Sequence, residues 1–166
     1  MKQQLLSGNY VALMEARISG ELQAEAMYRQ MANIFQGMGM FGAQKFCLAQ
    51  AEEEAGHYQK LVDILNDYGV VPAYTLKAVE IDQSFGISEL LMYAMQKEQE
   101  LFKAYSLIAY EAMSNTAEVE MGIHAVALEF VNIQRQAVGE FGDILARLDL
   151  KGDIYAFDKY LASLAE

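Results

Sequence analysis

The sequence contains very little of three residue types on which many small folds depend. It has one cysteine, Cys47, one proline and no tryptophan in 166 residues. A single cysteine excludes a disulfide framework and any cysteine-based zinc or iron–sulfur site. The chain is 54% hydrophobic and rich in Ala, Leu, Met, Gln and Glu. With so little proline, it has few of the residues that favour strands and turns. We therefore expect it to be almost entirely helical.

Basic residues are also scarce. The chain has 12 Lys and Arg against 23 Asp and Glu, which gives a formal net charge of −11. A nucleic-acid partner is not expected, because the binding face would have to be basic. No apolar run approaches the ~20 residues that a membrane-spanning helix needs, and the N-terminus lacks the apolar stretch of a signal peptide. The sequence therefore predicts a soluble cytoplasmic protein without a membrane partner.

Glycine, proline and short polar clusters divide the chain into helical blocks. The predicted helices are residues 7–35, 43–68, 84–113, 115–148 and 154–164. Asn115 and Glu118 resemble a capping box at the start of the fourth helix. The connection 69–86 is long enough to travel the length of a helix, which would make the second and third helices parallel. The prediction is one all-α domain over residues 1–166: a four-helix bundle with one long crossover and a short fifth helix.

Each long helix carries polar side chains in the middle of its apolar stripe. They are Glu21 in the first helix, Glu54 and His57 in the second, Glu98 in the third and Gln134 in the fourth. Buried carboxylates that converge require protons or a cation, and helices packed about 8–10 Å apart would bring these positions together. Oxygen and nitrogen ligands without sulfur suit iron or manganese.

The spacing of Glu54 and His57 adds to this interpretation. Residues at i and i+3 lie one turn apart on the same face, so both side chains can reach one small volume, and Glu54 can bridge two metals. A lone Glu-x-x-His also occurs by chance on solvated helices, and a single buried glutamate can simply have a protein partner. Polar residues on the buried stripes of four helices favour the metal centre over these alternatives.

Short segments around these polar residues share a further pattern. They are 20–24 with Tyr28, 52–57, 97–99, 131–134, 140–143 and 152–161. Together they resemble the non-haem ferritins of bacterial type, over essentially the whole chain. The resemblance implies that Glu21, Glu54 and His57 hold one iron ion. It also implies that Glu54 is shared with a second ion, whose site Glu98 completes with Gln134 nearby.

Two further residues take roles from the resemblance. Tyr28 would hydrogen-bond a metal ligand and could donate an electron, and Glu53 would stand beside the ligands or on the path of iron. The implied activity is oxidation of Fe(II) to Fe(III) by O₂ or H₂O₂, with two iron ions per subunit. The ferric mineral would be held in a shell of 24 identical subunits.

Two other functions remain open. One is a non-storage di-iron or di-manganese oxidase, which would lack the fifth helix and usually has a second Glu-x-x-His. The other is a cage subunit with a silent centre, which the presence of all four predicted ligands, Glu21, Glu54, His57 and Glu98, disfavours. In the fourth helix Gln134 is followed by Arg135, Gln136 and Ala137, so no second Glu-x-x-His occurs there.

Several positions depart from related families. Ala55 stands where bacterioferritins have a haem-binding methionine, so no haem is expected. Ile133, Gln136 and Ala137 replace glutamates that form a third iron site in some bacterial ferritins, which leaves that site missing or reduced to Glu53. One turn from Glu21, Glu25 is an added carboxylate that creates either a non-standard iron position or a hydrogen bond. His124 is too far along the fourth helix for the same centre, and a pore or packing role is expected.

Overall fold

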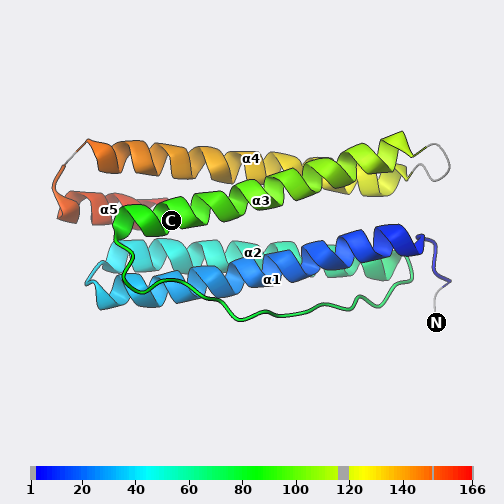
Figure 1. The fold of residues 1–166 in the computed structure, drawn as a ribbon, viewed down its shortest axis with the longest axis horizontal. Helices are drawn as coiled ribbons and strands as arrows, with labels where there is room; N and C mark the ends of the chain where they lie inside the picture. Colours follow the sequence, from blue (N-terminus) through cyan, green and yellow to red (C-terminus); the bar gives the residue numbers. More distant parts are fainter. Residues whose placement is uncertain (1–2, 116–119, 151, 166) are drawn as a thin grey trace. The chain divides into compact units, whose positions relative to one another are not determined.

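The computed structural model describes residues 3–115, 120–150 and 152–165 (Figure 1). Its elements are α1 (Gly8–Gly37), α2 (Phe41–Asp67), α3 (Ile87–Ser114), α4 (Met121–Asp149) and α5 (Ile154–Leu164). The described ranges contain no strand, so the predicted all-α class is confirmed. No helix in them is long and apolar enough to cross a lipid bilayer.

The start of α4 differs from the predicted one. The Asn115 amide donates to the Glu111 carbonyl at 3.1 Å, so Asn115 continues the pattern of α3 rather than opening α4. The other half of the predicted capping box, Glu118, lies outside the described residues. The α4 cap is supplied by Glu120, whose Oε1 accepts from the Gly122 amide at 3.2 Å. The helix therefore begins at Met121, six residues later than predicted.

The chain divides into two compact units. The first comprises residues 1–90 and 147–166, and the second comprises residues 91–146. The first unit contains α1, α2, the long connection and α5, while the second contains most of α3 and α4. That residues 1–166 form a single domain stays a prediction.

Two glycines with a left-handed backbone end α1 and α2. Gly39 and Gly69 each have φ +78°, a conformation that is costly for a residue with a Cβ. After each glycine the next amide donates to the carbonyl five residues earlier, as in a Schellman motif. The two bonds are Met40 N–H to Phe35 O and Val70 N–H to Leu65 O, both 2.9 Å long. These four side chains are buried, so each helix end combines a backbone hydrogen bond with buried apolar residues.

The connection between α2 and α3 runs along α1 (Figure 1). Three of its amides donate to side chains of that helix. The bonds are Ala73 to Glu15 Oε1 at 2.8 Å, Thr75 to Ser19 Oγ at 3.1 Å and Lys77 to Gln23 Oε1 at 3.2 Å. The predicted long crossover is thus an extended segment that follows α1 and is held by its side chains. Residues 74–81 of this segment form no strand within the chain.

The short α5 is attached to the start of α2. Asp158 accepts hydrogen bonds from the amides of Gly42 at 2.9 Å and Ala43 at 2.8 Å, and no side chain near Met40 caps α2. A Cβ on Gly42 would lie 2.7 Å from the Asp158 carbonyl carbon, so the contact requires glycine. Asp158 therefore caps α2 from a position 116 residues away in the sequence.

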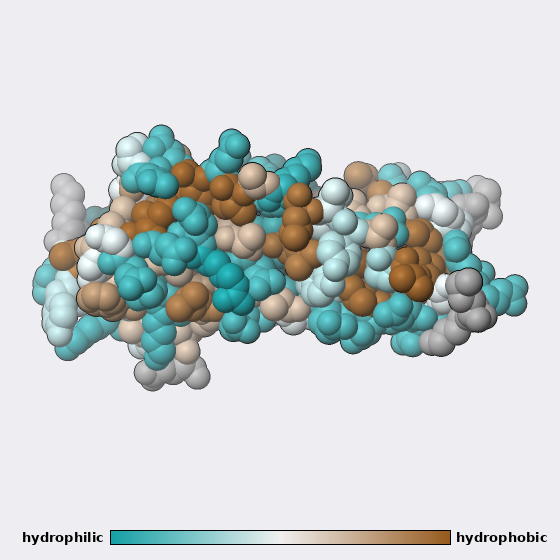
Figure 2. Space-filling view, turned by 90° about the horizontal axis from the view of Figure 1, so that it is seen from below, coloured by the Kyte–Doolittle hydropathy of each residue, from teal (hydrophilic) through white to brown (hydrophobic). Residues whose placement is uncertain are grey.

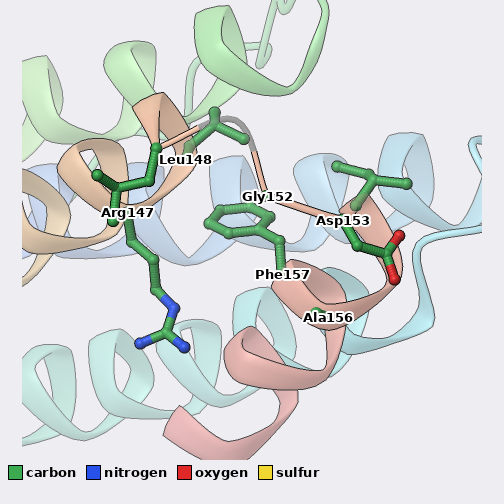
Figure 3. A pocket seen from close by; sticks show the side chains of 8 residues that line it. Arg147, Leu148, Gly152, Asp153, Ala156 and Phe157 are labelled. Atoms are coloured by element: carbon green, nitrogen blue, oxygen red, sulfur yellow. The ribbon is translucent and has the colours of Figure 1, made fainter.

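A second contact fixes the turn into α5. The guanidinium of Arg147 lies 4.0 Å from the centre of the Tyr160 ring, a cation–π arrangement. A pocket of about 350 Å³ lies at this turn, lined by Leu148 and Phe157 among others, and Figure 3 shows Arg147 extending toward α5. Asp153 caps α5 by accepting from the Tyr155 amide at 3.1 Å.

In the second unit, aromatic packing joins α3 and α4. The rings of Tyr105 and Phe130 are stacked with centroids 4.6 Å apart, and both side chains are fully buried. The imidazole Nδ1 of His124 lies 2.8 Å from the Ala109 carbonyl, so this ring joins the same two helices. That contact fits the packing alternative for His124, and the pore alternative stays a prediction.

Candidate metal centre

Three metal-ligating side chains meet in the first unit. Glu21 comes from α1, and Glu54 and His57 come from α2. One ligand atom from each lies within 4.8 Å of the other two, and no other group of this kind occurs among the described residues. The His57 Nδ1 is 3.3 Å from Glu54 Oε2 and 3.5 Å from Glu21 Oε2.

The helix pattern explains why these residues meet. Glu21 follows the buried residues Met14 and Ile18 along one face of α1. Glu54 and His57 are one turn apart on α2, as their i, i+3 spacing predicts. The side chains are 0%, 4% and 18% exposed for Glu21, Glu54 and His57 respectively, so the two carboxylates lie inside and only the imidazole edge reaches the surface.

The electrostatics of this cluster favour a cation. Burial lowers the pKa of His57, but hydrogen bonds to Glu21 and Glu54 and their charges outweigh it and raise the pKa to about 10. In the metal-free protein the imidazole is thus protonated at neutral pH, and its charge partly compensates two buried carboxylates. A bound dication would take over this role and release the proton.

The donor set selects among metals. Two carboxylates and one imidazole, without sulfur, suit iron or manganese. The thiol of Cys47 is fully buried, and burial raises its pKa, so the residue is expected to be unreactive.

Glu98 and Gln134 lie in the second unit, on α3 and α4. Both are buried, with 1% and 0% exposure. Within the described ranges, neither amide atom of Gln134 has a hydrogen-bond partner, which is costly for a buried side chain. Their predicted role as ligands of a second metal stays a prediction.

The two residues with auxiliary roles differ in environment. Tyr28 is fully buried on α1, two turns beyond Glu21, whereas Glu53 is exposed on α2. A buried phenol suits the predicted role near the ligands, and an exposed carboxylate suits a position on the path of iron. Both roles stay predictions.

Glu25 forms an ion pair, the second of the two alternatives that the sequence left open. Its Oε1 lies 2.9 Å from Arg29 Nη2, which also lies 3.0 Å from Glu52 Oε1. Arg29 thereby joins α1 to α2 close to the cluster. Sequence reasoning did not single out Arg29, although the i, i+4 spacing of Glu25 and Arg29 was a visible signal for this pair.

Comparison with known proteins agrees with this fold. The sequence model of the ferritin-like domain matches residues 11–150. A bacterial non-heme ferritin of Escherichia coli O6:H1 is 24% identical over 164 residues, which is 96% of this chain and 98% of the relative. The bacterial non-heme ferritin of Shigella flexneri has the same identity and coverage.

Solved structures are similar over the same length. A crystal structure of an open pore ferritin from the hyperthermophilic archaeon Archaeoglobus fulgidus has a TM-score of 0.84 at 21% identity, over 96% of this chain and 98% of that one. A humanized archaeal ferritin has a TM-score of 0.83 at 20% identity, over 95% and 97% of the two chains. These likenesses confirm the predicted ferritin-like fold. Because the family match extends over most of its residues, the chain belongs to the ferritin family.

Proposed function

We propose that this protein oxidises Fe(II) to Fe(III) and stores the ferric mineral inside a homo-oligomeric shell. The observation that carries the proposal is the buried cluster of Glu21, Glu54 and His57, with ligand atoms within 4.8 Å of one another. Membership of the ferritin family supports iron as the metal. The relatives named as bacterial non-heme ferritins support storage.

The proposal includes two iron ions per subunit as substrates. Glu21, Glu54 and His57 hold the first, and the resemblance to bacterial ferritins assigns the second to Glu54, Glu98 and Gln134. The buried amide of Gln134, which has no hydrogen-bond partner in the described ranges, supports this assignment because a nearby ligand or bound water would satisfy it.

The chemistry required of the protein residues is modest. Each Fe(II) gives up one electron to O₂ or H₂O₂, and anionic oxygen ligands favour the more highly charged product. His57 loses its proton when the metal binds. Tyr28 orients a ligand and supplies an electron where the oxidant needs one more. The exposed Glu53 attracts Fe(II) before it enters.

Shell formation is the second part of the proposal, with 24 subunits as the expected number. Exposed apolar side chains occur on the connection and on α5. They are Val71, Tyr74, Leu76, Ile154 and Tyr155, with 48–83% exposure. Figure 2, which looks onto the face along which the connection runs, shows hydrophobic side chains among hydrophilic ones. Apolar groups of this size at a surface support contacts with other subunits.

Aerobic addition of Fe(II) to the metal-free protein tests the ferroxidase. Ferric absorbance should grow much faster than in buffer for the wild type, and at the buffer rate for the double variant Glu54→Ala, His57→Ala. Glu80→Ala, which removes an exposed carboxylate from the connection, is the matched control and should keep the wild-type rate. Size-exclusion chromatography should give the same large assembly for all three proteins.

The outcomes separate the alternatives. Wild-type absorbance that grows no faster than in buffer would refute the ferroxidase and leave a silent subunit. A monomer or dimer in size exclusion would refute storage. Fast oxidation without iron retained in the protein fraction would indicate a non-storage oxidase.

A further inference from the structure

A buried tyrosine on α3, Tyr105, has no part in the reaction proposed above. It follows Glu98 by seven residues in the second unit, so both side chains lie on the same stripe of the helix. Seven helical residues rise about 10.5 Å, which is two turns. Glu98 and Tyr105 are 1% and 0% exposed, and Leu101, which lies between them on this stripe, is buried as well.

The ring of Tyr105 is fixed by stacking on Phe130 of α4. The ring centroids are 4.6 Å apart and the ring planes are 19° from parallel. Phe130 precedes Gln134 by four residues and therefore lies one turn away on the same face of α4. The stacked rings are thus within two turns, along α3 and along α4, of the two residues of this unit that the proposed function assigns to iron.

The first unit repeats this spacing. Tyr28 follows Glu21 by seven residues on α1, and both are 0% exposed. Each of these two helices therefore carries a buried glutamate and, two turns later, a buried phenol. Packing alone does not require the hydroxyl groups, because phenylalanine fills nearly the same space without a polar group to bury.

Electron counting gives two buried phenols a use. Reduction of O₂ to two water molecules takes four electrons and four protons, whereas two Fe(II) ions supply two electrons and by themselves carry O₂ only to H₂O₂. The chain contains no tryptophan, and its one thiol, Cys47, is buried with a raised pKa. Tyrosine is therefore the most readily oxidised aromatic side chain that the protein offers.

We propose that Tyr105 is a second electron donor beside Tyr28 in the reduction of O₂, which rests on the proposed ferroxidase function. Each phenol gives up one electron and its hydroxyl proton, and two protons from solvent complete the four. The products are two Fe(III) ions, two tyrosyl radicals and two water molecules. Each radical then takes one electron from a later Fe(II) ion and one proton from solvent, which restores the phenol. Electron donation requires no vacant position on the hydroxyl, so the other contacts of Tyr105 are compatible with it.

Rapid-freeze-quench electron paramagnetic resonance tests this role in the full-length protein, given two Fe(II) ions per subunit under O₂. The wild type should show the doublet of tyrosyl radicals, Tyr105→Phe should lose about half of it, and Tyr28→Phe should lose the other half. Phenylalanine at position 105 retains the ring that stacks on Phe130. The matched control is Tyr10→Phe, which removes a fully buried phenol three turns before Glu21 and should keep the full signal.

The reduced product of O₂ gives a second measurement. Release of H₂O₂ should be low in the wild type and in Tyr10→Phe and should rise in Tyr105→Phe, because one of the four electrons is missing. A purely structural effect would slow Fe(II) oxidation without changing the product, so the initial rate of oxidation is recorded for each variant.

The outcomes separate this role from the ferroxidase itself. Fe(II) oxidised at the wild-type rate, with radical and H₂O₂ yields unchanged in Tyr105→Phe, would overturn the role of Tyr105 and leave the ferroxidase intact. Equal losses of signal in Tyr105→Phe and Tyr10→Phe, or a wild type that oxidises Fe(II) without any radical, would overturn it too. A wild type that oxidises no Fe(II) would refute the ferroxidase and the electron donor together.

Discussion

Removing the Asp158 carboxylate should weaken the attachment of α5 to α2. Its two oxygens accept from the amides of Gly42 and Ala43 at 2.9 and 2.8 Å, and these amides belong to the first turn of α2, where no partner exists within the helix. The negative charge also lies at the positive end of the helix dipole. Asp158→Ala removes all of these interactions and adds no bulk.

The expected loss follows from the two bonds. A lost N-cap costs about 1 kcal/mol, and a second partly buried amide left without its charged acceptor adds an amount of the same order. The free energy of unfolding should therefore fall by about 2 kcal/mol. For a chain of this length, that corresponds to a decrease in Tm of roughly 4–8 °C. Asp158→Asn retains one acceptor and should lose about half as much.

Thermal unfolding at one fixed subunit concentration provides the measurement, because assembly makes Tm depend on concentration. Hydrogen exchange of the α5 amides should accelerate in parallel. Asp143→Ala is the control: this carboxylate is exposed on α4, and its loss should change stability by less than about 0.5 kcal/mol. If Asp158→Ala and Asp143→Ala melt at the same temperature, the cap makes no net contribution and the reasoning is refuted.

Three further predictions concern single side chains. The pKa of His57 is about 10 in the folded protein, above the ordinary 6.5. The protonated imidazole therefore stabilises the metal-free fold fully below pH 6.5, and this stabilisation is lost as the pH rises to 10. The difference in unfolding free energy between the wild type and His57→Gln should shrink over that interval, and a constant difference would contradict the pairing. Cys47 is fully buried and its pKa is raised, so iodoacetamide at pH 8 should label it far more slowly in native than in denatured protein; equal rates would disprove its burial. The Arg29 pairs are exposed, so Arg29→Gln should lower stability by less than about 1 kcal/mol in denaturant titrations, and a loss above about 2 kcal/mol would contradict that view.

Local spacing predicted the part of the site that depends on helix geometry. Glu54 and His57 share a face because residues three apart always do in a helix, and Glu21 was visible as a polar residue in an apolar stripe. The structure brings these three together. Glu25 stayed ambiguous in the sequence because a carboxylate beside a ligand fits both a metal and an ion pair. In the structure its carboxylate contacts Arg29, whose side chain also reaches from α1 to Glu52 on α2, and a metal role for Glu25 stays untested.

Contacts between distant segments could not be predicted. Asp158 caps α2 only because α5 folds back on the start of that helix. The need for glycine at position 42 likewise follows only from the Asp158 backbone that lies against it. The start of α4 was misplaced for a related reason. Asn115 has the composition of a cap, but its amide remains bonded to α3, and Glu120 caps α4 instead. The residue types indicated that a helix begins near this point, but the backbone hydrogen bonds determine the residue at which it begins.

The bonds between α1 and the connection match two different repeat lengths. On α1 the acceptors recur every four residues, at Glu15, Ser19 and Gln23, and on the connection the donors recur every two, at positions 73, 75 and 77. Four helical residues rise about 6.0 Å and two extended residues about 6.6 Å, so the two periods stay in phase over a few steps and then drift apart. A one-residue insertion between positions 73 and 77 would reverse which amides face α1, whereas a two-residue insertion would only shift the match by one step. Between positions 73 and 77 this segment can therefore gain or lose residues only in pairs if the same side of its backbone is to face α1.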